Sequence, residues 1–255
     1  MKLESSQPGH LLYVESLPEP ERSQILASLR QGDIYIANPT ARDRKGNPID
    51  APGGWIHHWL VAMYVPGVTL KEAAAMGQNY NKYSSYYKPE MVRTRLLSHS
   101  DDTFNVYARL QKKTPWLTIT LDTYSEVHYF FLGPHRFYTV SHFYRIQQVE
   151  DAGTPNEHRD PPGGGSGFLW AMDVYWRYQA VAGGILVESE TIALTRGVPF
   201  GFGWIIKPFV HRAAIATARG MMIRTRQILE EVAKNPSEVP DAKPGPGNDL
   251  RPAAR

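Results

Sequence analysis

The sequence predicts an α+β fold in which a curved antiparallel β-sheet is wrapped around one long C-terminal α-helix. Between about residues 56 and 196, aromatic and β-branched runs broken by Gly, Pro and Asp indicate β-strands. Residues 208–232 repeat apolar and small side chains at helical spacing on one face: Ala214, Ala218, Met221, Met222, Thr225 and Leu229. An antiparallel sheet must cover its apolar face, and this is the longest amphipathic helix available, so we expect it to lie across the sheet.

The composition narrows the functional classes. The chain of 255 residues can bury a sizeable core, and its formal net charge of +3 is too small to indicate a nucleic-acid partner. It has no cysteine, which excludes a disulfide framework, a thiolate nucleophile and a cysteine-based metal site. No apolar run reaches the roughly 18 residues of a membrane-spanning helix. The first ten residues lack the apolar region of a signal peptide, which leaves the compartment unknown, cytoplasmic or periplasmic.

We expect three regions along the chain. Residues 1–31 form an N-terminal helical extension, with a helix from Pro18 or Pro20 to Arg30. Residues 32–234 form the main domain. Residues 235–255 are rich in Pro, Gly and charge with few apolar side chains, so we expect a disordered tail.

Within the main domain the elements follow in order. A strand at residues 34–36 and a loop at 38–54 come first, and Thr69 caps a short helix at 70–75, followed by a helix or turn at 79–87. A long polar loop covers residues 151–167. The longer strands are expected at residues 56–65, 92–98, 103–111, 117–131, 137–149, 168–180 and 184–195.

This order of elements, together with four stretches, carries a family resemblance. The stretches are GGWIHHWLVAMYVPG (53–67), TITLDTYSEVHY (118–129), GFLWAMDVYWRY (167–178) and GGILVESETIALTRGVPFGFGW (183–204). Over roughly residues 30–232 the chain resembles the START-like, or SRPBCC, helix-grip superfamily. The sequence of these stretches is similar to that of an uncharacterised bacterial branch of the superfamily. The resemblance implies a sheet that grips the C-terminal helix around an apolar cavity, but no reaction. Where that branch tends to have Arg-Leu-Asn-Ser, this chain has AMDV at 171–174, so no polar role is carried over.

The alternation of side chains along each strand predicts which residues face the helix. We place the apolar residues inward, although the same residues could form a dry core. Small residues on the helix, an adaptable methionine pair and many aromatic side chains favour a cavity. The predicted ligand-binding residues are Met63, Val106, Ala108, Leu121, Val174 and Trp176 on strands, and Phe209, Ala214, Ala218, Met221 and Met222 on the helix.

Glu188 and Glu190 are the candidate acids. They share one face of a strand and could pair with Arg177 or Arg145. One interpretation is a cavity acid for general acid–base chemistry, as in cyclase-type members of the superfamily. The other is a cross-strand ion pair on a solvated face.

The histidines indicate no metal centre. His57 and His58 are adjacent on a strand and point to opposite faces, so they cannot chelate one metal together. A cluster of His128, His135 and His142 with Asp122 or Glu126 is conceivable, but the spacing does not require it. Metalloprotease, nucleophile-elbow and phosphate-loop motifs are absent, so we expect no metal and no cofactor.

The C-terminal region has a strongly basic segment. Between residues 191 and 229 there is no acid, but there are six cations: Arg196, Lys207, Arg212, Arg219, Arg224 and Arg226. Such a surface could dock transiently on an anionic membrane or hold an anionic head group, or it could be a solvated face balanced by acids of neighbouring loops.

The leading hypothesis is therefore a non-enzymatic protein that binds a lipid or other hydrophobic small molecule, with transport of that molecule as its extension. The alternatives are a cyclase/aromatase- or hydrolase-type enzyme that uses polar cavity residues, and a structural or partner-binding domain with a closed core.

Overall fold

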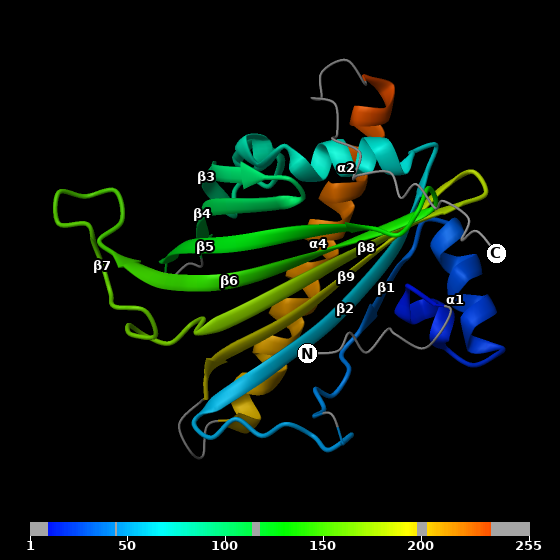
Figure 1. Ribbon diagram of the computed structural model, residues 1–255. Helices are drawn as coiled ribbons and strands as arrows, with labels where there is room; N and C mark the ends of the chain where they lie inside the picture. The colour runs from blue at the N-terminus through cyan, green and yellow to red at the C-terminus, as the bar shows by residue number, and fades with distance from the viewer. Residues whose placement is uncertain (1–9, 44, 114–117, 198–202, 236–255) are drawn as a thin grey trace, which may run out of the picture.

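The computed structural model describes residues 10–43, 45–113, 118–197 and 203–235, with the backbone alone for residues 203–211 and 213 (Figure 1). A single sheet of nine antiparallel strands forms the body of the molecule, in the order β1-β2-β9-β8-β6-β5-β4-β3, with β7 paired to β6. The strands are β1 Ile34–Ala37, β2 Gly54–Pro66, β3 Met91–Ser100, β4 Thr103–Lys113, β5 Thr118–Phe131, β6 Arg136–Glu150, β7 His158–Arg159, β8 Ala171–Val181 and β9 Gly184–Arg196.

The strands confirm the predicted sheet, with small differences in their bounds. The two-residue strand β7 lies within the segment predicted to be all loop, and β8 begins three residues after the predicted start at Phe168.

The helices are η1 Tyr13–Ser16, α1 Glu21–Arg30, α2 Leu70–Gln78, η2 Tyr80–Lys82, α3 Tyr83–Tyr86 and α4 Gly203–Lys234. Thr69 caps the start of α2 in a capping box. Its hydroxyl accepts a hydrogen bond from the Glu72 amide at 3.3 Å, and its own amide donates one to the Glu72 carboxylate at 2.7 Å. The predicted start of the last helix at residue 208 is wrong, because α4 begins five residues earlier. A proline in the second turn removes one backbone hydrogen bond, and the helix continues through it.

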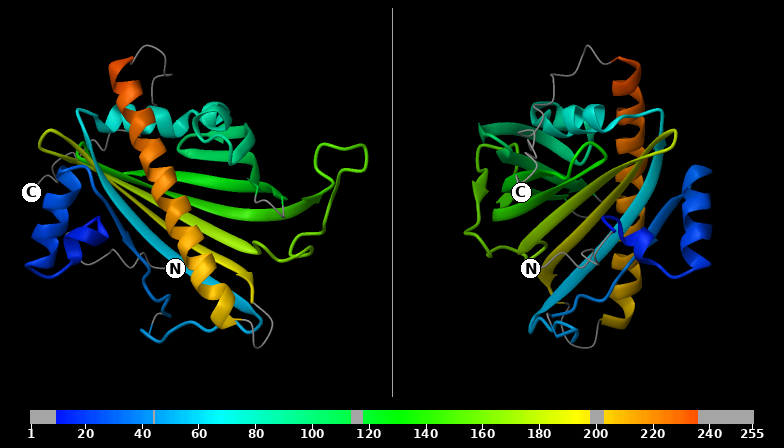
Figure 2. Two further views of the ribbon diagram at one scale, coloured as in Figure 1. Left: turned by 180° about the vertical axis from the view of Figure 1, so that it is seen from behind. Right: turned by 45° about the vertical axis from the view of Figure 1, so that its right-hand side comes forward.

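The two faces of the sheet are covered by different helices, as the view from behind and the oblique view in Figure 2 show. The face that α4 crosses, together with α2 and α3, is here called the concave face. The opposite, convex face carries the N-terminal segment, residues 11–30, which contains η1 and α1. None of the described helices is long and apolar enough to cross a membrane.

The main core lies on the concave face, where α4 and α2 meet the sheet. Met63, Val187 and Tyr178 pack there with Met222 and Leu229 of α4. The rings of Phe137 and Tyr178 stack with centroids 4.4 Å apart. The part of the concave face beneath α2 and the C-terminal half of α4 is therefore closed by tightly packed side chains.

A second, smaller core attaches the N-terminal segment to the convex face. Leu12, Val14 and Leu29 are buried against Ala62 of β2 and Leu186 of β9. The predicted helix ending at Arg30 is present as α1. The expected region boundaries near residues 31 and 234 stay predictions, and the expected disorder beyond residue 235 falls outside the described residues.

Candidate ligand-binding site on the concave face

Three of the predicted ligand-binding residues lie in the closed, tightly packed part of the concave face. Met63, Val106 and Met222 are buried within the main core. They contact other apolar side chains, which is the dry-core alternative that the alternation pattern left open.

The other predicted residues lie where the concave face is less completely covered. Those that remain partly exposed are Ala108, Leu121, Val174, Trp176, Ala214 and Ala218. Met221 is 37% exposed, so it lies on the flank of α4 rather than on the buried face that includes Met222. The side chain of Phe209 is outside the described residues.

Burial along β8 is inverted relative to a simple amphipathic strand. Val174 and Trp176 face α4 and are partly exposed, whereas Tyr175 and Arg177 point to the convex face and are buried. Alternate residues of a strand normally separate into a buried apolar set and a solvated polar set. Over residues 174–177 of β8, the apolar pair is the one that solvent reaches, whereas Tyr178 on the same face is buried in the main core.

Small and hydroxyl side chains surround these apolar residues. Trp176 lies between Ser189 of β9 and Thr139 of β6, and Val174 lies between Thr191 and Ser141. Sequence analysis placed the apolar residues of these strands but missed this set of hydroxyls. Their signal was present, because each stands at an inward position of its strand.

Buried tyrosines close the upper end of the concave face beneath α2 and α3. The hydroxyls of Tyr80 and Tyr129 are 3.2 Å apart, and the Tyr87 hydroxyl lies 3.1 Å from Thr225 Oγ1 on α4. Burial raises the pKa of Tyr87 to about 12 and raises the pKa of Tyr178 further. These phenols therefore remain neutral hydrogen-bonding groups at ordinary pH.

Glu188 and Glu190 lie on the convex face, which corrects both interpretations of these acids. Arg177, from β8, donates from Nη1 to Glu188 at 3.0 Å and from Nη2 to Glu190. The ion pair with Arg177 is present, but the face is not solvated, because the amides of Tyr13 and Val14 cover Glu188 and donate to it at 3.0 and 3.3 Å. Neither acid faces the helix, so neither is a cavity acid.

The environments of these two carboxyl groups differ. Burial raises the pKa of Glu188 to about 7, outweighing the charge of Arg177 and the two amide donors. Burial also acts on Glu190, but hydrogen bonds from His58, at 2.7 Å, and from Arg177 outweigh it and lower the Glu190 pKa. Arg145, the other predicted partner, instead lies over the ring of Tyr124 at 3.6 Å.

A second charged cluster lies at the other end of the convex face. Arg109 pairs with Asp122 at 2.7 Å and with Glu157 at 2.9 Å, and Arg159 pairs with Asp122 at 2.7 Å. These pairs attach the loop around β7 to the sheet. The side-chain hydrogen bond from Arg109 is the main reason why the pKa of Glu157 falls to about 2.

The histidines considered as metal ligands are separated. His128 pairs with Glu126, and His142 pairs with Asp173, each at 2.8 Å. Among the described residues, no group of three or more His, Cys, Asp or Glu side chains is placed to hold a metal ion.

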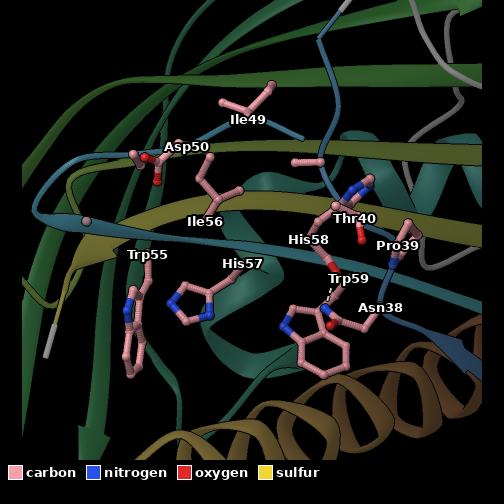
Figure 3. A pocket seen from close by; sticks show the side chains of 13 residues that line it. Asn38, Pro39, Thr40, Ile49, Asp50, Trp55, Ile56, His57, His58 and Trp59 are labelled. Carbon is pink, nitrogen blue, oxygen red and sulfur yellow. Dashed lines mark hydrogen bonds between the residues drawn. The ribbon is translucent and has the colours of Figure 1, made fainter. Parts of the chain in front are cut away.

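A pocket of about 450 Å³ lies at the start of β2, between this strand and the loop around residues 38–51. Trp55, His57 and Trp59 point from β2 toward the side of α4, while Ile56 points toward the loop (Figure 3). His57 Nε2 lies 2.9 Å from Thr195 Oγ1, and burial lowers the pKa of His57.

Another pocket, of about 390 Å³, lies beside His10 and Glu15 on the convex side. Neither pocket includes a predicted ligand-binding residue, so the enclosed apolar cavity stays a prediction.

Comparisons with known proteins add distant structural likenesses. No family model and no curated protein matches the chain. The chain is similar to a STAR-related lipid transfer protein from Xanthomonas axonopodis, with 15% identity, a TM-score of 0.47, and coverage of 71% of this chain and 96% of that one.

Two further solved structures show a similarly low sequence identity and TM-score. Human STARD10 has 9% identity and a TM-score of 0.43, covering 90% of this chain and 92% of its own. The Zhui aromatase/cyclase from Streptomyces sp. R1128 has 12% identity and a TM-score of 0.41, covering 71% and 98%. The antiparallel sheet and the C-terminal helix across its concave face, as described above, give this chain an α+β helix-grip fold.

Proposed function

We propose that this protein binds a lipid or another hydrophobic small molecule on the concave face, between α4 and the central strands, and carries it without transforming it. The observation that carries the proposal is the inverted burial along β8. Val174 and Trp176 face the helix and are partly exposed, although the chain buries Arg177 on the opposite face. A ligand that covers these apolar side chains would remove them from water.

The energetics require a ligand of substantial size. Burying apolar surface contributes about 25 cal/mol per Å². Association itself costs an estimated 4–15 kcal/mol or more. A ligand must therefore bury several hundred Å² of apolar surface, as an acyl chain or a fused ring system does.

The alternative, a cyclase- or hydrolase-type enzyme, required Glu188 or Glu190 to act as an acid in the ligand cavity. Glu188 is buried on the convex face, where it contacts Arg177 and the N-terminal segment. A ligand on the concave face would be separated from it by the sheet. We therefore favour binding over catalysis.

Two variants of α4 test the proposal. Ala218 is partly buried and packs against the main core, whereas Ala216, two residues away, is exposed. The protein, purified without detergent, is first examined by native mass spectrometry and organic extraction for a bound apolar molecule. Ala218→Leu should fill part of the binding space and lower ligand occupancy at least 10-fold, while Ala216→Leu should leave it unchanged.

Thermal unfolding separates binding from a closed core. A ligand that binds only the folded protein raises its Tm with concentration. If no apolar molecule binds, and Ala218→Leu lowers the Tm because the core is already full, the proposal fails.

We further propose that α4 contacts an anionic membrane surface when the ligand is exchanged. Arg212, Arg219 and Arg224 are exposed on α4, next to Met221 at 37% and Ile223 at 43% exposure. Cations beside apolar side chains favour the interface of an anionic bilayer. Flotation with phosphatidylcholine liposomes should increase when phosphatidylserine is added, and Arg219→Glu with Arg224→Glu should abolish the increase. Arg22→Glu, on α1, is the control, and flotation that ignores phosphatidylserine would refute this docking.

A further inference from the structure

We infer that the ligand of the concave face is electrically neutral: an uncharged lipid whose few polar atoms are hydroxyl, carbonyl or ester oxygens. This inference rests on the proposed function and deepens it. It comes from how the fold divides charged side chains between the two faces of the sheet.

Apart from two residues at strand ends, the charged side chains of the described strands point to the convex face. Strand register places Arg109 opposite Asp122, and Arg177 opposite Glu188 and beside Glu190. The same convex parity includes Arg93, Arg95, Glu126, Arg136, Arg145 and Asp173. The positions between them, which face α4, carry mainly apolar, hydroxyl or aromatic side chains along the middle of each strand. Two histidines share this parity, His57 on β2 and His99 on β3, and burial lowers the pKa of His57, which favours its neutral form.

Two charged residues have concave parity in the described strands, and both lie at strand ends. Lys112 stands one residue before the end of β4, where its Nζ lies 3.4 Å from Thr217 Oγ1 and 3.8 Å from the Glu90 carboxylate. Glu150 is the last residue of β6 and accepts a hydrogen bond from Gln148. Both residues therefore lie at the edge of the concave face, and each already has a hydrogen-bond or ion-pair partner.

The described part of α4 repeats this division. Its buried side presents Ala218, Met222 and Thr225 to the core, with no charged side chain among the described residues of that side. Arg212, Arg219 and Arg224 are exposed on the other sides. Arg226 donates to the carbonyls of Gly32 and Asp33, at 2.7 and 3.3 Å.

A charged ligand group would therefore find no described counter-ion in the middle of this face. Moving an ion out of water without a partner is strongly unfavourable, whereas a neutral oxygen needs only one or two hydrogen bonds. Hydroxyls suited to this are available beside Val174 and Trp176, namely those of Thr139, Ser141, Ser189 and Thr191. The face is therefore expected to discriminate against ligands that carry a charged group.

The test uses pairs of probes that differ in one charged group. Oleyl alcohol is compared with oleate, and cholesterol with cholesteryl sulfate, at pH 8, where both anions are fully ionised. Binding is followed by tryptophan fluorescence and by the shift in Tm. We expect the neutral member of a pair to bind at least 10-fold more tightly than its anion.

A charge placed on the concave face should reverse this preference. Val174→Lys introduces a cation beside the hydroxyls, and should bind the anionic probe more tightly than the neutral one. Tyr144→Lys adds the same charge at a position that is 50% exposed, and should keep the original preference. Ser141→Lys, at the position paired with Val174, replaces Val174→Lys if circular dichroism shows that the latter does not fold.

The outcomes separate the inference from the function on which it rests. Anionic probes that bind as tightly as their neutral partners overturn the inference and leave the proposed function intact. If all four probes fail to bind, and purified protein carries no apolar molecule, the proposed function falls together with the inference.

Discussion

Arg177 and Glu188 form an ion pair that water hardly reaches: Arg177 Nη1 lies 3.0 Å from Glu188 Oε1, and their side chains are 1% and 0% exposed. The pair spans β8 and β9 beneath the N-terminal segment, whose Tyr13 and Val14 amides also donate to Glu188. Because backbone donors from residues 13 and 14 complete the environment of Glu188, the N-terminal segment is part of the folded unit.

The first prediction concerns the charge balance of this network. Arg177→Ala leaves Glu188 and Glu190 buried without their shared cation, and should lower the free energy of unfolding by about 3–5 kcal/mol. Urea unfolding at pH 8, above the Glu188 pKa of about 7, measures this. Arg22→Ala removes an exposed pair with Glu19 and should leave the midpoint unchanged. An Arg177→Ala protein as stable as the wild type would show that Glu188 and Glu190 are not buried charges.

The second prediction concerns pH. Because burial raises the pKa of Glu188 to about 7, the folded protein keeps a proton that the unfolded chain releases near 4.5. The stabilisation from this proton is present below pH 4.5 and is lost as the pH rises to 7, on the order of 3 kcal/mol. The groups that face Glu188 are Arg177, Glu190 and the amides of Tyr13 and Val14.

Glu188→Gln measures this effect, because glutamine does not titrate. The stability of the wild type relative to the variant, from urea unfolding at several pH values, should fall between pH 5 and pH 8. Glu190 titrates in both proteins, so its opposite contribution cancels. A difference that stays constant or rises with pH would contradict the raised pKa.

The third prediction concerns the attachment of the N-terminal segment. Leu12 is buried in the second core with Val14 and Leu186, so Leu12→Ala should cost about 2–5 kcal/mol. Hydrogen exchange of the Tyr13 and Val14 amides should accelerate, because their bonds to Glu188 depend on this contact. Val92→Ala, at a position that is 49% exposed on β3, should change stability by less than about 0.5 kcal/mol. Unchanged exchange in Leu12→Ala would mean that the segment is held by other contacts.

The fourth prediction concerns the cap of α2. Thr69→Ala removes one half of the capping box with Glu72 and should cost about 0.5–2 kcal/mol of stability. Thr69→Ser keeps a hydroxyl acceptor and should restore most of it. A Thr69→Ala protein with wild-type stability would show that the box is not formed in solution.

The sequence predicted the strands and the side of each residue well, because strand alternation is a local property. Val174 and Trp176 were placed on the helix side, and the structure has them there. Local alternation does not show what covers a face. Glu188 was therefore expected either in a cavity or on a solvated surface, and the contact with Tyr13, 175 residues away, was not foreseen.

The candidate site was less accessible to prediction for the same reason. Met63 and Val174 share the concave parity, yet Met63 is fully buried in the core and Val174 is partly exposed. The difference depends on where α4, α2 and α3 lie over the sheet, which is a tertiary property. The start of α4 was placed five residues too late, and the helix continues through Pro208 in its second turn.

The separation of the two faces has a consequence for how this protein could change over evolutionary time. Along β9, Ser189 and Thr191 face the helix, while Glu188 contacts the N-terminal segment on the opposite face and Glu190 pairs there with His58 and Arg177. If the proposed function holds, substitutions at Ser189 and Thr191 would alter the ligand-binding surface without touching the ion pairs of Glu188 and Glu190. On that proposal, a new ligand specificity would arise by single substitutions, each starting from a protein that still folds.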